Sequence, residues 1–548
     1  MKVASNPKRG LDADVIIVGA GPTGLVLANL LGQYGVHTIL LERNATTVKE
    51  PRAVSIDDES LRSIQAIGLD AKLTPLLASG YGSHYKGPDG SVFAIVEPTS
   101  REFGFEKRNA FQQPDLEAIL RDGLSRFSSL DVRFSCNVSS VLQSGAGVVL
   151  SYTDKAGKAF DLTSRYLVGA DGARSFVRKS LGIELGGSSF EQRWLIIDLF
   201  RTENLFRHTE VFCDPKRPAI TLPGPHGTRR YEFMLRADES EEHATSEAFA
   251  RSLLASVGPD GDAPLRRIKS YLFHARVAQS WRCGLIFLAG DAAHLSPPFA
   301  GQGMNSGIRD AHNLAWKLAS AVRHKVSEQF LDSYQVERLP HARAMIDLAL
   351  SMGAVMMPSS RARAVATRIG FRALSLCPPV RNYVSQMRYK PQPRFHAGLM
   401  WPDGRGRRSI VGRLFPQPDV ENVAGERLRF DDALGTGPVI VLFGERPASI
   451  TNERHLEHIL SSGARVVVLT PDWINPCEAR FPVYRDASRR LANMRDYLDH
   501  AILLRPDRYV AAAVPLHRIG SLKDAVGQMI GLADGRHDSN LYGNDAVS

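Results

Sequence analysis

The stretch that decides the fold is GAGPTG at residues 19–24, which directly follows the apolar, β-branched run DVIIV at residues 14–18. Such a run is typical of a buried parallel strand. A G-x-G-x-x-G turn between a strand and a helix lets the backbone approach a pyrophosphate at the helix N-terminus. Residues 25–34 have the composition of that helix, so the pattern predicts the first half of a dinucleotide-binding unit.

The second half follows at once. A second strand is predicted at residues 38–41 and ends in Glu42, 23 positions after Gly19, near the spacing of an acid that binds a ribose diol. Each glycine of the turn has a reason: Gly19 permits the tight turn, Gly21 the approach of the backbone to phosphate, and Gly24 the close packing of helix on sheet. A glycine turn in an unrelated α/β unit is the alternative.

Two more glycine–carboxylate motifs follow predicted strands. LVGADGARSFVR at residues 167–178 places Asp171 and Gly172 after a short strand, and LIFLAGDAAH at residues 285–294 places Gly290 and Asp291 after another. Open α/β sheets bind ligands at that edge. Next comes GQGMN at residues 301–305, before a predicted helix whose N-terminus would face a flat, electron-rich ring. Asp171 has an ordinary alternative as a turn or helix-capping residue.

The three motifs, in this order, resemble the group A flavoprotein monooxygenases, the family of para-hydroxybenzoate and phenol hydroxylases. YQVERLP at residues 334–340 matches a further family element. The resemblance implies FAD held non-covalently, with NADH as co-substrate, NADPH left open, and O₂. It implies that Glu42 binds the adenosine ribose, that Asp291 binds the ribityl chain, and that Asp171 and Gly172 support both nucleotides. The other implied cofactor contacts are Arg43, Arg52, Gln113, Gly301, Gly303, Met304 and Asn305.

The resemblance also implies an α/β fold in three parts. A Rossmann-like FAD-binding domain is expected at residues 12–85, 105–185 and 280–370, and a β-sheet substrate domain at residues 86–104 and 186–279. Short strands rich in β-formers are predicted at residues 210–213, 219–222 and 230–234. After a linker at residues 371–394, a thioredoxin-like domain without C-x-x-C is expected at residues 395–533, with a structural or dimer-forming role, so a homodimer is a candidate assembly. A disordered tail is expected at residues 534–548.

Longer segments resemble one branch of the family, the 3-(3-hydroxyphenyl)propionate and 3-hydroxycinnamate hydroxylases. They include PRAVSIDDE at residues 51–59, CDPKRP at residues 213–218 and LRPDRYV at residues 504–510. The branch implies ortho-hydroxylation of a phenolic acid to the 2,3-dihydroxy product in bacterial aromatic catabolism. A hydroxylase of another phenol, such as phenol, resorcinol or a polyketide, stays an alternative, as does a non-catalytic flavin-binding interaction protein.

No nucleophilic triad is recognisable, so the catalytic candidates are few. Asp57 and Asp58 are candidate acceptors of the phenol proton, against an exposed helix-start role, and His294 is a candidate against simple capping or packing. A carboxylate-bearing substrate calls for an arginine, for which Arg108, Arg217 and Arg230 are candidates. The aromatic residues Phe212, Tyr231 and Phe233 are expected either to line a phenol pocket or to fill the sheet core.

Composition limits the remaining classes. The net charge of +10 has no run of five basic residues behind it, so a spread basic surface is favoured over a nucleic-acid site. The five cysteines form no C-x-x-C pair and lie far apart, which argues against a disulfide framework or a zinc site and fits a cytoplasmic setting. No metal-ligand cluster is recognised. The apolar residues 15–31 are interrupted by glycines and proline, so they predict a strand and a helix, not a membrane span.

Overall fold

The computed structural model describes residues 10–145, 147–444, 460, 464–471 and 480–529. The chain folds into two compact units: unit 1 comprises residues 1–100, 106–311 and 342–391, and unit 2 comprises residues 101–105, 312–341 and 392–548. Among the described residues, no helix has the length and apolar character needed to cross a membrane.

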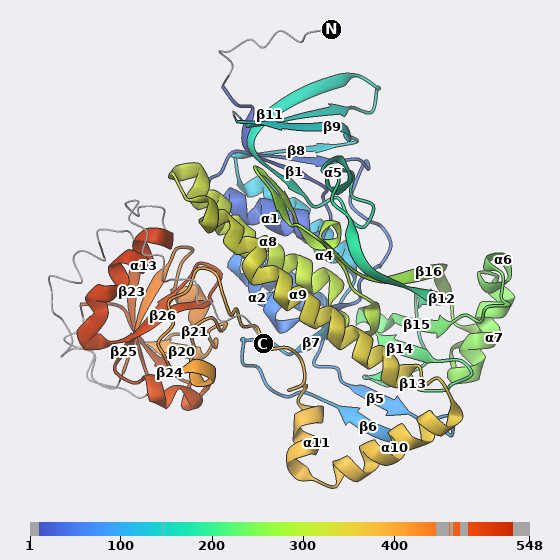
Figure 1. Cartoon of the computed structure of the whole chain (residues 1–548). Helices are drawn as coiled ribbons and strands as arrows, with labels where there is room; N and C mark the ends of the chain where they lie inside the picture. Colours follow the sequence, from blue (N-terminus) through green and yellow to red (C-terminus); the bar gives the residue numbers. More distant parts are fainter. Residues whose placement is uncertain (1–9, 146, 445–459, 461–463, 472–479, 530–548) are drawn as a thin grey trace, which may run out of the picture. The chain divides into compact units, whose positions relative to one another are not determined.

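The first sheet of unit 1, of which Figure 1 labels β1, β8, β9 and β11, has the strand order β17-β18-β11-β1-β2-β8. Strands β8, β2, β1, β11 and β18 run parallel. The predicted first strand, helix and second strand are β1 (Ala13–Val18), α1 (Pro22–Gln33) and β2 (Thr38–Glu42). The other bounds are β8 Leu130–Phe134, β9 Asn137–Ser144, β10 Gly147–Thr153, β11 Ala159–Gly169, β17 Arg282–Cys283 and β18 Ile286–Leu288. The apolar runs are continuous because helices cover the sheet.

The second sheet of unit 1 has the order β19-β16-β12-β15-β14-β13-β5-β6. The three predicted strands are confirmed as β13 (Thr209–Phe212), β14 (Ala219–Pro223) and β15 (Arg229–Met234). The two longest, β12 (Leu185–Leu199) and β16 (Leu265–Ala278), were not predicted. The remaining strands are β5 Ser83–Lys86, β6 Val92–Val96 and β19 His294–Leu295. A small sheet pairs β7 (Arg108–Ala110) with β3 (Ser55–Asp57) and β4 (Ala78–Ser79).

Two separate apolar clusters form on the strands of the second sheet. One packs Leu195, Ile197, Tyr231 and Phe233 with residues of α7 (Glu247–Val257). The other packs Trp194 and residues of β5, β6 and β13 with residues of α9 (Glu328–Met356) and α10 (Arg361–Ser375). Because side chains alternate along a strand, Trp194 and Leu195 lie on opposite faces. The sheet therefore has an α7 face and an opposite face.

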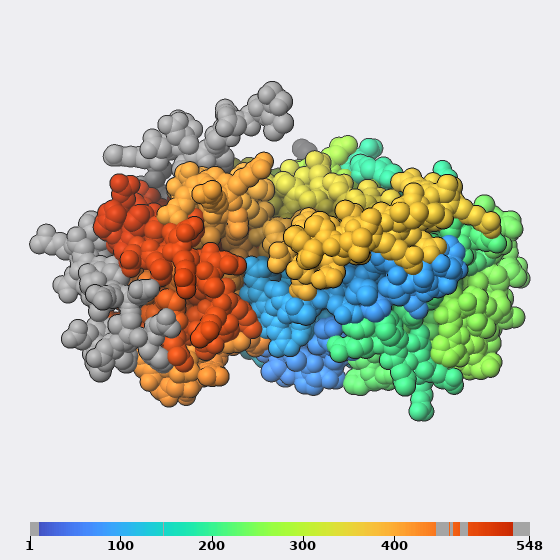
Figure 2. Space-filling view, turned by 90° about the horizontal axis from the view of Figure 1, so that it is seen from below, coloured from blue at the N-terminus to red at the C-terminus, as the bar shows by residue number. Residues whose placement is uncertain are grey.

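Helices α10 and α11 (Pro378–Ser385) lie along the β5–β6 edge of this sheet (Figure 2). The predicted linker at residues 371–394 thus contains α11 and the end of α10, and both helices belong to unit 1. The predicted boundary between an FAD-binding and a substrate domain stays a prediction, because both sheets lie in the same unit. The other unit 1 helices are α2 Asp58–Ala66, α3 Asp70–Leu73, α4 Gln113–Gly123, α5 Phe176–Ser180 and α6 Glu241–Ala244, and α8 (Gly303–Arg323) begins in this unit.

Unit 2 has one sheet, of order β21-β20-β24-β23-β22-β25-β26. Its central, largely buried strands are β22 (Val439–Phe443), β23 (Arg465–Thr470) and β25 (His500–Leu504). Strands β22, β23 and β24 are parallel, and β25 and β26 are antiparallel neighbours, which confirms the thioredoxin-like class. The other bounds are β20 Asp419–Asn422, β21 Arg427–Arg429, β24 Val483–Asp486, β26 Val510–Pro515 and α13 Leu522–Met529. The predicted tail, residues 534–548, lies outside the described residues.

Candidate functional site

The predicted cofactor motifs meet at one edge of the first sheet. The glycine turn follows β1, Glu42 ends β2, Asp171 follows β11, and Gly290 follows β18. These four strands are parallel neighbours in the order β2-β1-β11-β18. Their carboxyl ends therefore bring segments from four parts of the sequence to the edge where open α/β sheets bind ligands.

The glycine turn has the geometry that close packing demands. Gly19 adopts a positive φ of 108°, and a Cβ there would lie 2.4 Å from the Ala170 carbonyl oxygen. A Cβ on Gly24 would lie 1.9 Å from the Gly19 oxygen. At Gly21 and Gly303, by contrast, a Cβ would meet nothing within 4 Å. Gly19 and Gly24 thus serve the fold, whereas Gly21 and Gly303 border open space at the starts of α1 and α8.

Glu42 is half-buried and holds the turn. Its Oε2 accepts the Ala20 N–H at 2.9 Å and its Oε1 accepts the Asn44 N–H at 2.8 Å. A carboxylate has further lone pairs, so a ribose diol can still bind there. Arg43 is exposed beside it.

Arg52 and Gln113 lie in a hydrogen-bonded segment. Gln113 is buried, and its side-chain oxygen accepts the Ala53 N–H at 2.7 Å. The Arg52 side chain is exposed, while its carbonyl accepts a bond from Arg230 at 2.6 Å. Gln113 therefore fixes the course of the backbone next to Arg52.

Asp171 caps the start of α5. Its carboxylate accepts Ser175 Oγ–H at 2.5 Å and the Phe176 N–H at 2.6 Å, and Gly172 has a φ of 80°. This is the capping role weighed as the alternative, and it leaves Gly172 at the sheet edge. Arg178, which the sequence did not single out, donates to the Ala292 oxygen at 3.0 Å and so ties this turn to the one after β18.

Gly290 and Asp291 form a tight turn that His294 supports. His294 is buried, stacks on Trp281 with ring centroids 5.0 Å apart, and pairs through Nε2 with Asp310 at 2.6 Å. Packing and hydrogen bonding thus account for His294, as its alternative predicted. Asp291 is exposed to solvent, yet the surrounding protein raises the pKa of its carboxyl group by desolvation, so this group faces both protein and open space.

Two glycines from other elements pack against Thr23 of α1. A Cβ on Gly290 would lie 2.5 Å from Thr23 Oγ1, and a Cβ on Gly307 of α8 would lie 2.3 Å from the same atom. Helix α1, the turn after β18 and helix α8 therefore pack at distances that only glycine allows.

The loop before α8 is tied to β3. Gly301 adopts a φ of 62°, and the Asn305 amide donates to the Gly301 oxygen at 2.7 Å and to the Ser55 oxygen at 3.2 Å. Asn305 Oδ1 accepts the Asp57 N–H at 3.1 Å. Met304 is half-buried between these residues.

Asp57 and Asp58 start α2, as predicted, but the expectation that they are exposed is wrong. Both are buried, with Glu59, because Lys390 and Arg309 reach them. Lys390 Nζ lies 3.1 Å from Asp57 and 2.7 Å from Glu59, and Arg309 pairs with both carboxylates. Lys390 Nζ lies 4.0 Å from Asp58, farther than from Asp57 or Glu59.

Asp58 is therefore the carboxyl group of the three with the weakest ion pair. Burial, reinforced by Asp57 and Glu59 and opposed by Lys390, raises the pKa of Asp58 to about 7. Burial alone would also raise the pKa of Asp57, but Arg309 and Lys390 outweigh it and hold that pKa below its usual value. Asp58 therefore titrates near neutrality, whereas Asp57 stays ionised.

The three candidate arginines differ in their partners. Arg217 pairs with Glu239, and Arg230 pairs with Asp198 at 2.6 Å. Arg108 donates to Ser83 Oγ and lies over the Tyr81 ring, 4.3 Å from its centroid. Within the described ranges, no carboxylate pairs with Arg108. Two candidates are thus already neutralised.

The three candidate aromatic residues lie in the core on the α7 face of the second sheet. Tyr231 and Phe233 stack with centroids 6.3 Å apart, Tyr231 donates to Asp260 at 2.6 Å, and Phe212 packs against the same cluster. This placement favours the sheet-core alternative over the phenol pocket.

Other aromatic residues, missed from the sequence, lie beside the loop before α8. Phe299, two residues before Gly301, packs edge-on against Trp194 at 5.5 Å, Phe190 at 5.6 Å and Phe273 at 6.0 Å. They belong to the face opposite α7. These rings come together only in the folded chain: β12 pairs with β16, which brings residues 190–194 next to residue 273, and Phe299 packs on them.

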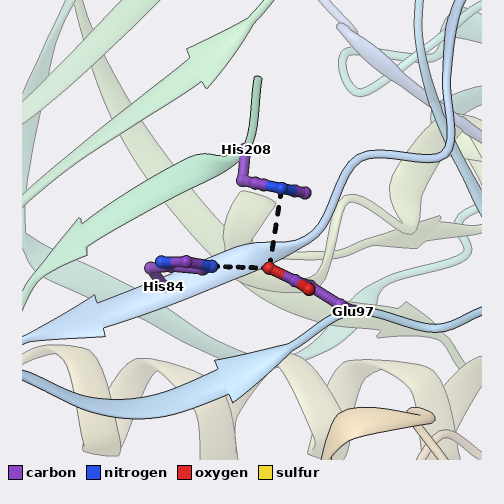
Figure 3. A group of neighbouring side chains, drawn as sticks. All are labelled: His84, Glu97 and His208. Carbon is purple, nitrogen blue, oxygen red and sulfur yellow. Dashed lines mark hydrogen bonds and ion pairs between the residues drawn. The ribbon is translucent and has the colours of Figure 1, made fainter. Parts of the chain in front are cut away.

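Two histidines and a glutamate also converge, as Figure 3 shows. Glu97 Oε1 lies 2.6 Å from His84 Nε2 and 3.5 Å from His208 Nε2. No metal-ligand cluster was recognised in the sequence, and this spacing would suit one. However, His208 Nδ1 accepts the Gly82 N–H at 2.8 Å, which puts the ring proton on Nε2, facing Glu97. The arrangement is a hydrogen-bonded cluster in which His208 has no free lone pair to give a metal.

Comparison with known proteins agrees with this geometry. A family model described as FAD binding domain matches residues 12–349, and one described as HcaD C-terminal domain matches residues 412–529. A curated 3-(3-hydroxy-phenyl)propionate/3-hydroxycinnamic acid hydroxylase of Klebsiella pneumoniae subsp. pneumoniae is 38% identical over 530 residues, covering 95% of this chain and 96% of that protein. A protein of the same name from Mycobacterium sp. (strain JLS) is 37% identical and covers 96% and 93%.

Solved structures show the same fold. The flavin-dependent monooxygenase PieE, in complex with FAD and substrate, superposes with a TM-score of 0.81 at 21% identity, covering 96% of this chain and all of that one. The OxyS anhydrotetracycline hydroxylase from Streptomyces rimosus gives 0.74 at 23% identity, covering 95% and 99%. At these identities the likeness concerns the fold alone.

Proposed function

We propose that this chain, which belongs to the FAD binding domain family, ortho-hydroxylates a phenolic acid of the 3-(3-hydroxyphenyl)propionate type, including 3-hydroxycinnamate. The single observation that carries the proposal is the meeting of Glu42, the glycine turn, Asp171 and Asp291 at the ends of four adjacent parallel strands. The substrate is taken from relatives that bear that name and match over nearly the full length of both chains.

The residues present fit FAD. Gly21 and Gly303 leave open space at two helix N-termini, where N–H groups and the helix dipole favour phosphate and an electron-rich ring. Glu42 would hold the adenosine ribose, with Arg43 beside it, and Asp291 the ribityl chain. Arg52, Gln113 and the Asp171–Gly172 turn would border the nucleotide, and Gly301, Met304 and Asn305 the flavin ring.

When bound, FAD supplies hydride acceptance and oxygen activation, which no side chain provides. The overall reaction is substrate plus NADH, H⁺ and O₂ giving the 2,3-dihydroxy product, NAD⁺ and H₂O. We propose NADH as donor, with NADPH as the alternative. The chain's own residues position the ring and exclude water. The aromatic wall of Phe299, Trp194 and Phe273 is the apolar surface suited to both tasks.

Asp58 is the proposed acceptor of protons near the site. Its carboxyl group titrates near neutrality and lies one residue from Asp57, whose N–H is bonded to Asn305 at the start of α8. A homodimer and a cytoplasmic location complete the proposal.

The proposed reaction can be tested with isotopically labelled oxygen. Purified protein with FAD, NADH and ¹⁸O₂ is incubated with 3-(3-hydroxyphenyl)propionate, and the product is analysed by mass spectrometry. We expect one labelled oxygen in a new catechol and NADH oxidation that depends on substrate. 3-Phenylpropionate, which lacks the phenol, should give no product. H₂O₂ without catechol would exclude this substrate, and faster labelled turnover of phenol or resorcinol would favour the other-phenol alternative.

A further inference from the structure

Of the three candidate arginines, Arg108 is the one without a carboxylate partner among the described residues. Arg217 forms an ion pair with Glu239, and Arg230 forms one with Asp198. Arg108, on β7, bonds only to Ser83 Oγ among the described residues. Arg108 is half-buried, and sheltering its charge without a counter-ion carries a desolvation cost. A ligand anion would remove that cost.

The guanidinium of Arg108 is held in a fixed plane. It stacks on the Tyr81 ring at 4.3 Å and donates through Nη1 to Ser83. Its Nε and Nη2 N–H groups form no hydrogen bond within the described part of the chain. The planar edge that they define is the one that binds carboxylates with two parallel bonds.

Two tyrosines, Tyr85 and Tyr389, lie within reach of the charge of Arg108. Tyr85 stands two residues after Ser83 on β5, so both side chains are on one face of the sheet. Tyr389 follows α11, next to Met387, which packs in the same cluster as Tyr85. The charge of Arg108 acts on the ionisation of both phenols.

Both hydroxyls are available as donors. No hydrogen bond of either is found in the described residues, and neither oxygen is among the buried unpaired atoms. Burial raises the pKa of Tyr85 and of Tyr389, against a smaller lowering by Arg108, so both stay protonated at neutral pH. An anion would thus meet a cation and two O–H donors.

The surroundings of these donors suit an aryl acid. Phe93, Phe371, Val384 and Met387 belong to the apolar cluster around Tyr85. The site also connects to the loop before α8. The Tyr81 hydroxyl donates to Ser55 Oγ at 2.7 Å, and Ser55 Cβ lies 3.4 Å from where a Cβ on Gly301 would be. The polar end of a ligand bound here therefore lies two side chains from that loop.

We infer that Arg108, with the hydroxyls of Tyr85 and Tyr389, binds the carboxylate of the substrate and selects acids over neutral phenols. The inference rests on the proposed function. Arg108 is a specificity residue here, since it contacts the end of the substrate that does not react.

The experiment measures binding without turnover. The dissociation constants of 3-(3-hydroxyphenyl)propionate and of its carboxamide are determined from the change in flavin absorption, with no NADH present. In wild type the acid should bind more tightly than the amide. Arg108→Gln should weaken acid binding roughly 10- to 100-fold, which is the usual contribution of a hydrogen bond between charged groups. It should change amide binding less than about 3-fold. Tyr389→Phe should weaken only the acid, by roughly 3- to 10-fold.

Matched controls separate this from a general charge effect. Arg207→Gln removes an exposed arginine from a neighbouring segment, and Tyr383→Phe removes an exposed hydroxyl from α11. Both should keep the acid-to-amide ratio of wild type. If Arg108→Gln does not retain FAD, the same two dissociation constants are measured for Tyr389→Phe and Arg108→Lys. Arg108→Lys keeps the positive charge but loses the planar edge.

The outcomes are distinct. Unchanged acid binding in Arg108→Gln and Tyr389→Phe, or equal losses for acid and amide, would overturn the assignment of the carboxylate site. Wild-type protein that keeps FAD but binds neither ligand would instead overturn the proposed function. A loss confined to the acid supports both.

Discussion

His294 Nε2 lies 2.6 Å from Asp310 Oδ2, and the same carboxylate oxygen accepts the Gly290 N–H at 3.0 Å. Asp310 belongs to α8 and is fully buried, as is His294. One carboxylate oxygen of α8 thus holds both the turn after β18 and the histidine behind it. The turn after β18 and helix α8 are therefore joined by these side-chain hydrogen bonds, although they are separated in the chain.

Removing that oxygen should loosen the turn. Asp310→Ala leaves the Gly290 N–H and the His294 ring without their acceptor, which should cost about 2–4 kcal/mol of unfolding free energy. The FAD content of the purified protein should fall with it. Denaturant unfolding of the apoprotein and the ratio of flavin to protein absorbance measure the two effects.

Asp310→Asn is the matched variant, because an amide oxygen can take both bonds. It should retain most of the stability and most of the FAD. Equal losses in the two variants would show that the charge of Asp310, and not its acceptor atom, holds the turn.

Gly21 and Gly24 should respond differently to the same methyl group. A Cβ at Gly21 enters open space, so Gly21→Ala should leave the apoprotein folded and lower FAD affinity at least roughly 10-fold by blocking the approach of phosphate. A Cβ at Gly24 meets the Gly19 oxygen at 1.9 Å, so Gly24→Ala should lower stability itself.

Circular dichroism and thermal unfolding of the apoproteins, with FAD titration followed by fluorescence quenching, separate the two. Gly303→Ala, also facing open space, is a second test at the other helix start. Normal FAD affinity in Gly21→Ala would place the pyrophosphate elsewhere.

The glycine motifs were predictable because their constraint is local. A strand, a turn with positive φ and a helix start follow each other in the chain, and Gly19, Gly172 and Gly290 carry that constraint in their own dihedral angles. The side of a strand that faces a ligand is not local. Alternation shows that Tyr231 and Phe233 share a face, but only α7, packed against them, decides that the face is core.

The ion pairs of the charged candidates could not be predicted from the sequence for the same reason. Asp57 looks like an exposed helix cap in the sequence, and it does accept the Ser60 N–H at 3.0 Å. Its burial depends on Lys390, 333 positions away, and on Arg309, 252 positions away. Likewise Arg108 differs from Arg217 and Arg230 only in its tertiary partners. Sequence spacing contains no information on such pairs.

In unit 2, Glu337 of the YQVERLP element lies in a fully buried charge network. It pairs with Lys317 at 2.7 Å and with Arg505 at 2.8 Å. Glu337→Gln leaves those cations underneutralised in the interior, which should cost about 3–5 kcal/mol. Glu426→Gln, at an exposed position, should change stability by less than about 0.5 kcal/mol.

The loss of unfolding free energy in Glu337→Gln should depend on pH. Burial raises the pKa of Glu337, but Arg505 and Lys317 outweigh it and lower that pKa to about 2. A depressed pKa stabilises the fold above the usual pKa of 4.5, and the gain is lost as pH falls toward 2. The gap between wild type and Glu337→Gln should therefore narrow below pH 4.5, and a constant gap would argue against an ionised Glu337.

Asp58 should give the opposite pH dependence. Its pKa is raised by burial, and further by Asp57 and Glu59, from 3.8 to about 7. Between these two values the folded state binds more protons than the unfolded state, so the free energy of unfolding falls as pH rises through this window. Asp58→Asn, which mimics the protonated form, should remove that slope and become more stable relative to wild type, by on the order of 4 kcal/mol above pH 7. Denaturant unfolding from pH 4 to 8 measures the difference, with the exposed Asp122→Asn as control. Parallel curves for wild type and Asp58→Asn would mean that Asp58 is ionised throughout, and it would then no longer be a candidate to accept protons at neutral pH.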